Sequence, residues 1–262
     1  MVSIKEKIRI FVKATKIFKN WNDLLSVYFK LTKKETIIFK TKNNIKLKIR
    51  VNSTDFMALT NVWIIEEYAK EGFHIKNDDI VIDIGGHIGL FSIYAAEKCK
   101  SGKIFSFEPV KENFEMLKDN IAVNKIKNIF PENVAISNEK SKVTIFLSND
   151  ESGHGMYSKS SNSITIDAIN LEEIYLKNNV KKCDFLKIDA EGAEFDILEN
   201  ISENMLKTIS KIVIEYHIFN RNLTERLENI VEKFEKNGFK ITKTPYSDTL
   251  GLLFLSNENH RS

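Results

Sequence analysis

A glycine-rich turn is the strongest chemical signal in the sequence. The run VIDIGGHIGLF at residues 81–91 contains Asp83, then Gly85 and Gly86, and then Gly89. Glycines at this density after an apolar strand let the backbone approach a ligand closely, and the helix that follows offers free N–H groups at its N-terminus. A phosphate would be repelled by the carboxylate of Asp83. The turn therefore indicates a ligand that carries a cationic group.

Glu108 is a second carboxylate suited to the same ligand. It lies 19 residues after Gly89, at the predicted end of the next strand, where a carboxylate can accept hydrogen bonds from both hydroxyls of a ribose. S-adenosylmethionine fits, because it has a ribose, an ammonium, a carboxylate and a cationic sulfonium but no phosphate. Asp83 would attract the ammonium, and the turn would bind the carboxylate. Glu108 alone is equally compatible with NAD, and both side chains can also serve only as helix caps.

A second group of carboxylates follows a later apolar strand. In the run DFLKIDAEGAEFD at residues 184–196, Asp189 ends the strand, and Glu191 and Glu194 are predicted in the first turn of the next helix. We interpret these three side chains as catalytic, either as a general base for an acceptor hydroxyl or as ligands of a divalent metal ion. Acidic residues also favour helix N-termini for structural reasons alone. Lys187 is predicted on the opposite face of the strand, as a structural ion-pair partner.

Two histidines and one loop accompany these carboxylates. His217 ends the strand IVIEYH and is either a second candidate base, because histidine titrates near neutral pH, or a hydrogen-bonded residue at the rim of the site. His87 lies inside the glycine turn and is predicted to shape the cofactor pocket. The polar loop 148–163 is either a lid that binds substrate or a surface loop.

Alternating strands and helices must position these residues. The apolar pattern predicts strands at 80–84, 103–107, within 129–136, and at 143–147, 163–169, 184–188, 211–216, 239–243 and 250–255. It predicts helices at 88–98, 111–124, 171–178, 193–200 and 223–237. Such alternation indicates a parallel sheet, but the last two strands are too close in sequence for a crossover and must form an antiparallel hairpin. Ligands of such sheets bind at the carboxyl ends of the strands, where the glycine turn lies.

The N-terminal part is interpreted as an α/β extension. We divide the chain into an extension at 1–79, with a hairpin at 35–51 and a helix at 55–71, and a main domain at 80–256. Residues 1–20 hold five lysines and one arginine against one glutamate, and they are predicted to form a basic amphipathic helix. This helix can either lie on an anionic membrane surface or pack against the domain with its lysines in solvent.

The composition excludes several classes of protein. The 262 residues are 42% hydrophobic and 29% charged, and the net charge of +3 gives no global indication of nucleic-acid binding. No apolar run has the length of a transmembrane helix, and the N-terminus lacks the pattern of a signal peptide. The two cysteines, Cys99 and Cys183, do not suggest a disulfide framework. We therefore expect a cytoplasmic protein, with peripheral membrane contact through residues 1–20 as the alternative.

Several motifs of the chain together carry a family resemblance. The runs are VIDIGGHIGLFSIYAA, FSFEPVKENFEMLKDNIAVN, NVAIS, FLKIDAEGAEFDIL and IVIEYH, within about residues 50–255. They resemble the FkbM-type family of S-adenosylmethionine-dependent methyltransferases. The resemblance implies a Rossmann-like class I methyltransferase fold, an α/β fold with a seven-stranded, mostly parallel sheet. It also implies O-methylation of a hydroxyl on a sugar, glycan or secondary metabolite.

The resemblance also implies roles for individual residues. It implies cofactor contacts at Asp83, Gly85, Gly86, Gly89 and Glu108, and an adenine side at Asn133 and Ala135. It makes Asp189 and Glu191 the candidates nearest the methyl group. Members of the family often have Ala-Asn where this chain has Gly86-His87, which leaves the role of His87 open.

Two other classes of function stay open at this stage. One is an NAD-dependent oxidoreductase, which Asp83 disfavours, and the other is a non-catalytic binding module of the same fold. A nucleic-acid methylase is disfavoured because the chain reads Asp189-Ala190-Glu191-Gly192 where amino-methylating enzymes of this fold usually carry an N/D-P-P-aromatic motif. We expect a small-molecule or glycan acceptor and no nucleic acid, and we leave the metal and the oligomeric state open.

Overall fold

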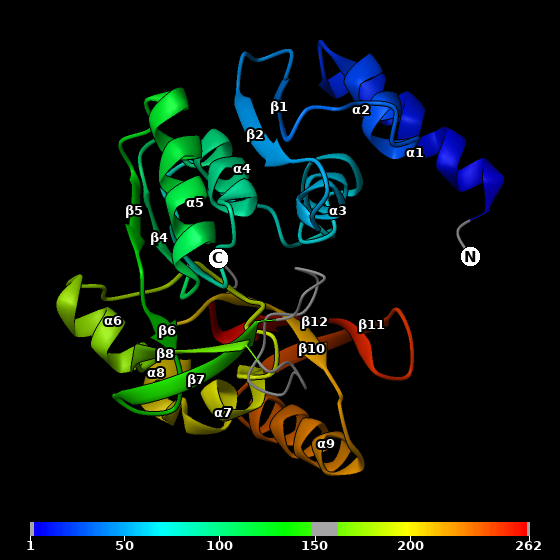
Figure 1. The fold of residues 1–262 in the computed structure, drawn as a ribbon. Helices are drawn as coiled ribbons and strands as arrows, with labels where there is room; N and C mark the ends of the chain where they lie inside the picture. Colours follow the sequence, from blue (N-terminus) through cyan, green and yellow to red (C-terminus); the bar gives the residue numbers. More distant parts are fainter. Residues whose placement is uncertain (1–2, 148–161, 261–262) are drawn as a thin grey trace.

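A seven-stranded β-sheet forms the centre of the protein (Figure 1). A computed structural model describes residues 3–147 and 162–260. The strands lie in the order β11-β12-β10-β9-β3-β4-β5. Their bounds are β3 Ile80–Ile84, β4 Lys103–Phe107, β5 Ile129–Glu132, β9 Phe185–Ile188, β10 Lys211–His217, β11 Phe239–Pro245 and β12 Leu250–Asn257.

The directions of the strands confirm the sequence-based prediction. Strands β5, β4, β3, β9 and β10 run parallel to one another, whereas β12 pairs antiparallel with both β10 and β11. The chain moves outward from β3 to β4 and β5, and it then returns to the other side of β3 through β9. The strand order therefore reverses at β3, and the glycine turn follows this strand.

Helices cover both faces of the sheet (Figure 1). One face is covered by α4 (Leu90–Lys98), α5 (Lys111–Asn124) and the N-terminal extension. The other is covered by α6 (Leu171–Lys177), α7 (Glu194–Asn200), α8 (Glu203–Leu206) and α9 (Arg221–Lys236). Neighbouring residues of one strand divide between the two cores, as with Val81 and Ile82, because side chains alternate along a strand.

The N-terminal extension packs on the sheet and shares its core. Its elements are α1 Ile4–Ile17, α2 Trp21–Tyr28, β1 Thr36–Lys40, β2 Lys46–Arg50, α3 Asp55–Leu59 and the π-helix η1 Thr60–Ile65. The strands β1 and β2 form the predicted hairpin. Buried residues of the extension, such as Phe18 and Phe39, belong to the same core as Phe91 of α4. The boundary at residues 79 and 80 stays a prediction.

The predicted helix at 55–71 is wrong in its second half. The α-helical part ends at Leu59, and residues 60–65 form the π-helix. Glu66 then takes a left-handed backbone conformation, with φ +59°, which ends the helix. The Glu66 carboxylate is held by Lys13 at 2.8 Å and by the Tyr94 hydroxyl at 3.1 Å. These tertiary contacts turn the chain toward the sheet, against the apolar periodicity that predicted a longer helix.

A second, small sheet lies beside the carboxyl edge of the main one. It contains β6 (Ala135–Ile136), β7 (Ser141–Leu147) and β8 (Asn162–Ile169), in the order β6-β8-β7. The strand predicted within 129–136 is thus divided between two sheets. Most of the loop predicted as a lid, residues 148–161, lies outside the described residues. Across 3–147 and 162–260, no helix is both long and apolar enough to cross a bilayer, and the cytoplasmic location stays a prediction.

Candidate functional site

A cavity of about 210 Å³ lies at the carboxyl edge of the main sheet. Ile84 pairs in register with Phe107 on one side and with Ile188 on the other. The residues that follow these three strands therefore lie at the same height along the strand direction. Gly85, Glu108 and Asp189 are thus neighbours at the carboxyl edge of the sheet. All three line the cavity. On the side of β4 and the small sheet the lining is mostly apolar, with Phe107, Val110, Ala135, Ile136, Val143 and Ile145.

Gly85 lets the turn pack directly against Asp189. Its backbone is left-handed, with φ +77°, and a Cβ atom there would stand 1.7 Å from the carbonyl oxygen of Asp189. The N–H groups of Gly85 and Gly86 both donate to the carbonyl of Phe107, at 3.0 and 2.9 Å. Gly85 and Gly86 line the cavity, whereas Gly89 packs against the side chain of Leu117 on α5. The first two glycines thus border the cavity, but their N–H groups already donate within the protein and do not offer the free donors that were expected for a ligand carboxylate. Gly89 is the N-cap of α4.

The carboxylate of Glu108 is held in the cavity wall by two backbone groups. Oε2 accepts a hydrogen bond from the N–H of His87 at 2.8 Å, and Oε1 accepts one from the N–H of Val110 at 2.8 Å. Burial raises the pKa of Glu108 to about 7. The orientation of this carboxylate is therefore set before any ligand binds.

The two residues predicted beside adenine have different positions. The side-chain amide of Asn133 donates to the carbonyls of Glu108 and Pro109, both at 2.8 Å. Ala135 instead lines the cavity. Asn133 therefore fixes the backbone after β4, and Ala135 forms part of the apolar wall.

Asp83 lies behind the turn and is paired with a buried lysine. The Nζ atom of Lys187 is 3.2 Å from Oδ1 of Asp83 and 3.6 Å from Oδ2 of Asp189, and it donates to the carbonyl of Gly85 at 2.8 Å. The Ser92 hydroxyl donates to Oδ2 of Asp83 at 2.7 Å. Asp83 is fully buried, so the structure gives its charge an internal partner. Its contact with a ligand ammonium stays a prediction.

The prediction that Lys187 faces away from Asp189 is wrong. Lys187 lines the same cavity as Asp189. The physical reason is the period of two along a strand, which puts residues 187 and 189 on the same side. Burial lowers the pKa of Lys187, but the charges of Asp83 and Asp189 outweigh burial and raise it above its usual range. The ammonium is therefore a permanent positive charge under the glycine turn.

Four carboxylates line the cavity on the side of β9 and β10, namely Glu67, Asp189, Glu191 and Glu215. Burial, and next the charge of Asp189, raises the pKa of Glu67 to about 7 and the pKa values of Glu191 and Glu215 to about 8. The hydroxyl of Tyr68 donates to Oε2 of Glu215 at 3.2 Å. These raised pKa values mean that the cavity holds protons on its carboxyl groups rather than gathering more negative charge. A cationic ligand would favour their ionised forms, whereas a phosphate would add to the repulsion.

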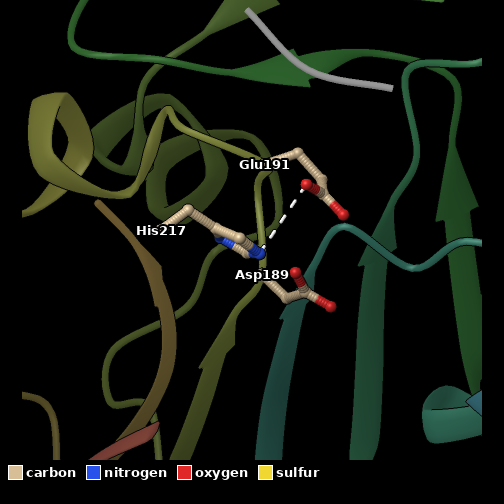
Figure 2. A group of neighbouring side chains, drawn as sticks. All are labelled: Asp189, Glu191 and His217. Atoms are coloured by element: carbon tan, nitrogen blue, oxygen red, sulfur yellow. Dashed lines mark ion pairs between the residues drawn. The ribbon is translucent and has the colours of Figure 1, made fainter. Parts of the chain in front are cut away.

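Asp189, Glu191 and His217 form a cluster that can hold a metal ion (Figure 2). One ligand atom of each side chain lies within 4.8 Å of the others. Nε2 of His217 is 3.7 Å from Oε2 of Glu191. Burial lowers the pKa of His217, but its hydrogen bond to Glu194 and the charges of Glu194 and Glu191 outweigh burial and raise it to about 10.

Glu194 is buried and holds His217 and the turn that carries Glu191. Its carboxylate accepts hydrogen bonds from the N–H groups of Ala190 at 2.9 Å and Gly192 at 2.8 Å, and Oε1 lies 3.2 Å from Nδ1 of His217. The helix α7 begins only at Glu194. The prediction that Glu191 lies in its first turn is therefore wrong, because Glu191 sits in the preceding turn with φ +49°. This turn directs Glu191 into the cavity.

His87 connects the glycine turn to the N-terminal extension. Its Nε2 atom is 3.3 Å from Oδ1 of Asp55 and 3.4 Å from a guanidinium nitrogen of Arg50. Arg50 donates two side-chain hydrogen bonds to Asp55, at 2.8 and 3.0 Å, and one to Asn113 at 2.8 Å. Burial lowers the pKa of His87 to about 4, so the ring is neutral at pH 7. The ring is thus fixed on one side while the His87 N–H holds Glu108 on the other.

The sequence did not indicate Glu67, and the position predicted for Lys187 was wrong. Glu67 follows the π-helix and belongs to no recognisable motif, so no sequence signal indicated it. Lys187 could have been assigned to the cavity from its spacing to Asp189. Arg50 and Asp55, which fix His87, were likewise not singled out.

Two solved structures share the fold of this chain. Methyltransferase FkbM from Methylobacillus flagellatus is 14% identical with a TM-score of 0.51, over 96% of this chain and 59% of that chain. The fibrillarin pre-rRNA processing protein of Methanococcus jannaschii is 16% identical with a TM-score of 0.50, over 86% of this chain and 83% of that chain. These similarities confirm the predicted Rossmann-like class I methyltransferase fold.

The family itself follows from the sequence comparison. The family model described as the methyltransferase FkbM domain matches residues 83–241, which is more than half of the chain. The protein therefore belongs to the FkbM methyltransferase family, as its motifs predicted.

Individual relatives are more distant. The antimetabolite synthetase AmbE of Pseudomonas aeruginosa is 22% identical over 74% of this chain and 11% of its own length. Methyltransferase 1 of Beauveria bassiana is 21% identical over 53% of this chain and 65% of its own length. The hexuronic acid methyltransferase AglP of Haloferax volcanii is 25% identical over 54% of this chain and 57% of its own length. The chain thus spans less than two thirds of each of these relatives.

Proposed function

We propose that the protein is an S-adenosylmethionine-dependent O-methyltransferase that acts on a hydroxyl of a sugar, glycan or secondary metabolite. The observation that carries the proposal is the acidic cavity beside the glycine turn. The sulfonium and ammonium of S-adenosylmethionine complement the carboxylates of Glu67, Asp189 and Glu215, which line this cavity. The diphosphate of NAD would meet the same carboxylates, which argues against the oxidoreductase alternative.

The wall of the cavity suits the rest of the cofactor. Glu108 is held with its carboxylate in the wall and can accept hydrogen bonds from both ribose hydroxyls. The apolar residues Val110, Ala135 and Ile136 offer a surface for the adenine ring. Backbone groups of Gly85 and Gly86 border the position of the amino-acid end. These groups follow β5, β4 and β3, which are neighbours in the sheet.

Asp189 is the proposed general base. When bound, S-adenosylmethionine supplies the methyl group that is transferred to the acceptor oxygen. Asp189 lies against Gly85 at the edge of the cavity, so its carboxylate can accept the proton of an acceptor hydroxyl as that oxygen becomes a nucleophile. Glu191 and His217 lie beside it and can bind further hydroxyls of the acceptor. Glu194 acts on the reaction only by orienting these two side chains.

The class of acceptor is supported by one relative. AglP is named as a hexuronic acid methyltransferase, and a sugar offers several hydroxyls for a site rich in carboxylates. We therefore place sugars first among the acceptors to be tested, with neutral hexoses and hexuronic acids side by side, because the acidic lining should disfavour the carboxylate of a hexuronic acid.

Transfer of a labelled methyl group to a panel of sugars tests the proposal. The parent protein should methylate at least one member, and Asp189→Asn should lower the rate by roughly 100-fold or more, because it removes the base. Glu228→Gln, an exposed acid on α9, is the matched control and should retain the parental rate.

Two outcomes would contradict parts of the proposal. If Asp189→Asn transferred at the parental rate, Asp189 would not be the base. Binding of S-adenosylhomocysteine without transfer to any acceptor of the panel would favour the non-catalytic binding module.

A further inference from the structure

The outer surface of α1 carries a line of apolar side chains in solvent. Ile4, Ile8 and Val12 are 78%, 57% and 47% exposed. Their spacing of four residues aligns them along one side of the helix. The end of α2 and the residues after it add Tyr28 at 52%, Phe29 at 60% and Leu31 at 73%. We call these six residues the N-terminal patch.

The N-terminal patch is distinct from the side of α1 that packs on the protein. Ala14 and Phe18 are buried in the core, and Ile10 and Ile17 pack against it. Lys13 forms an ion pair at 2.8 Å with Glu66, at the end of the π-helix. The helix is therefore attached through one side, and a second apolar side faces away. The packing of α1 on the domain thus leaves a surface available for a partner.

The two helices present their exposed side chains together. The Nζ atom of Lys7 on α1 donates to the hydroxyl of Tyr28 at 3.0 Å, and the rings of Tyr28 and Phe29 meet edge to face at 5.0 Å. Figure 1 shows α1 and α2 at the periphery of the molecule, beyond the hairpin of β1 and β2. An extended flat partner can therefore reach both helices at once.

Positive charge surrounds the N-terminal patch. Residues 3–34 contain eight lysines and one arginine against one glutamate and one aspartate, a net charge of +7. The whole chain carries only +3, so the remainder is net negative. Exposed Lys5, Arg9 and Lys16 lie along the outer side of α1, next to the apolar line. The combination of exposed apolar and basic side chains is complementary to an anionic lipid surface.

We propose that the N-terminal patch docks the protein on an anionic lipid bilayer, with α1 lying in the plane of the interface. Ile4, Ile8 and Val12 would enter the boundary between headgroups and acyl chains, as in other interfacial helices. Tyr28 and Phe29 would lie at the headgroup level, which aromatic rings favour. The basic side chains would face the headgroup phosphates. This proposal does not depend on the reaction that the cavity catalyses.

Vesicle flotation with the full chain tests the docking surface. One set of vesicles contains phosphatidylcholine alone, and the other contains phosphatidylcholine and phosphatidylglycerol in a fixed ratio. Both sets are used at low salt. The parent should float with the anionic vesicles and be released by salt. The triple variant Ile4→Ser, Ile8→Ser, Val12→Ser should lose about tenfold in affinity for each of its three substitutions, because each removes an apolar side chain that binding would bury in the bilayer. Leu176→Ser, 81% exposed on α6, is the matched control and should float as the parent does.

A charge variant separates the two contributions. Lys5→Gln, Arg9→Gln, Lys16→Gln should lose roughly fivefold per residue on anionic vesicles, and little on neutral ones. These positions are exposed, so circular dichroism should show parental folding for both variants.

Three results would overturn the proposal. The first is a parent protein that does not float with anionic vesicles, and the second is a triple variant that floats as well as the parent. The third comes from sedimentation in the absence of lipid. A parent dimer that becomes a monomer in the triple variant would assign the N-terminal patch to contact between protein chains.

Discussion

The buried pair of Lys187 and Asp83 gives the most quantitative prediction about how the site is held together. The two charges are 3.2 Å apart, and their side chains are 4% and 0% exposed. At that separation Coulomb's law with an effective dielectric constant of about 20 gives an attraction of about 5 kcal/mol. The cost of removing both charges from water offsets much of this attraction, so the net contribution of the intact pair is small. The loss of one partner is not offset, because it leaves the other charge buried.

Lys187→Met is therefore expected to lower the free energy of unfolding by about 3–5 kcal/mol. Asp83→Asn leaves Asp189, at 3.6 Å, as the ion-pair partner of Lys187, and it should also destabilise the protein. The double variant should cost less than the sum of the two single variants, with a coupling energy of about 3 kcal/mol. Urea denaturation followed by circular dichroism measures all three differences.

A surface lysine provides the matched control for this cycle. Lys182 pairs with Asp184 at 2.9 Å, but its side chain is 61% exposed. Lys182→Met should therefore cost at most about 1 kcal/mol. The reasoning fails if Lys182→Met costs as much as Lys187→Met. It also fails if the coupling between Lys187 and Asp83 is below about 1 kcal/mol, the range of exposed pairs.

Three further predictions concern the turn and the cluster. Gly85→Ala should abolish cofactor binding, because its Cβ would stand 1.7 Å from a backbone oxygen, whereas Gly72→Ala, with similar φ and nothing within 4 Å, should cost only about 1 kcal/mol of stability by urea denaturation. The pKa of His87 is about 4 in the folded protein and 6.5 for an ordinary histidine, because burial disfavours the charged ring. The unfolded chain therefore binds the proton first, and stability that is present above pH 6.5 is lost as the pH falls toward 4. The loss is at most about 3 kcal/mol, because part of the ring is exposed, and it should be absent in His87→Gln. If the cluster of Figure 2 holds a divalent cation, calorimetry with Mn²⁺ alone should show one binding site, which Glu191→Ala or His217→Ala should remove. The absence of binding heat in the parent protein would remove the metal hypothesis.

The parallel sheet could be predicted because its signals are local. Each strand of the sheet is a short apolar run that ends at a turn, and the closeness of the last two strands required an antiparallel hairpin. The glycine turn, Glu108 and Asp189 came together as expected, because all of them follow parallel strands.

Other features depended on contacts that the sequence does not display. The helix at 55–71 ended early because Glu66 is held by Lys13, which is 53 residues away. The charge of Asp83 predicted an acidic environment for a ligand, but its nearest cation is Lys187, more than a hundred residues later. Glu67 reaches the cavity only through the path of the chain after the π-helix. For Glu66 and Asp83, a pair with a residue far away in the sequence determined the surroundings of a side chain whose local pattern was uninformative.

Isothermal titration of the protein with S-adenosylhomocysteine and with NAD⁺ distinguishes the proposed cofactor from a dinucleotide. We expect saturable binding of S-adenosylhomocysteine at one site, and no binding of NAD⁺ to the acidic cavity. At a pH above the pKa of about 7 of Glu108, where this carboxyl is ionised, Glu108→Gln should weaken the binding at least about tenfold, because the ribose hydroxyls lose a charged acceptor. Saturable binding of NAD⁺ with no heat from S-adenosylhomocysteine would contradict the account.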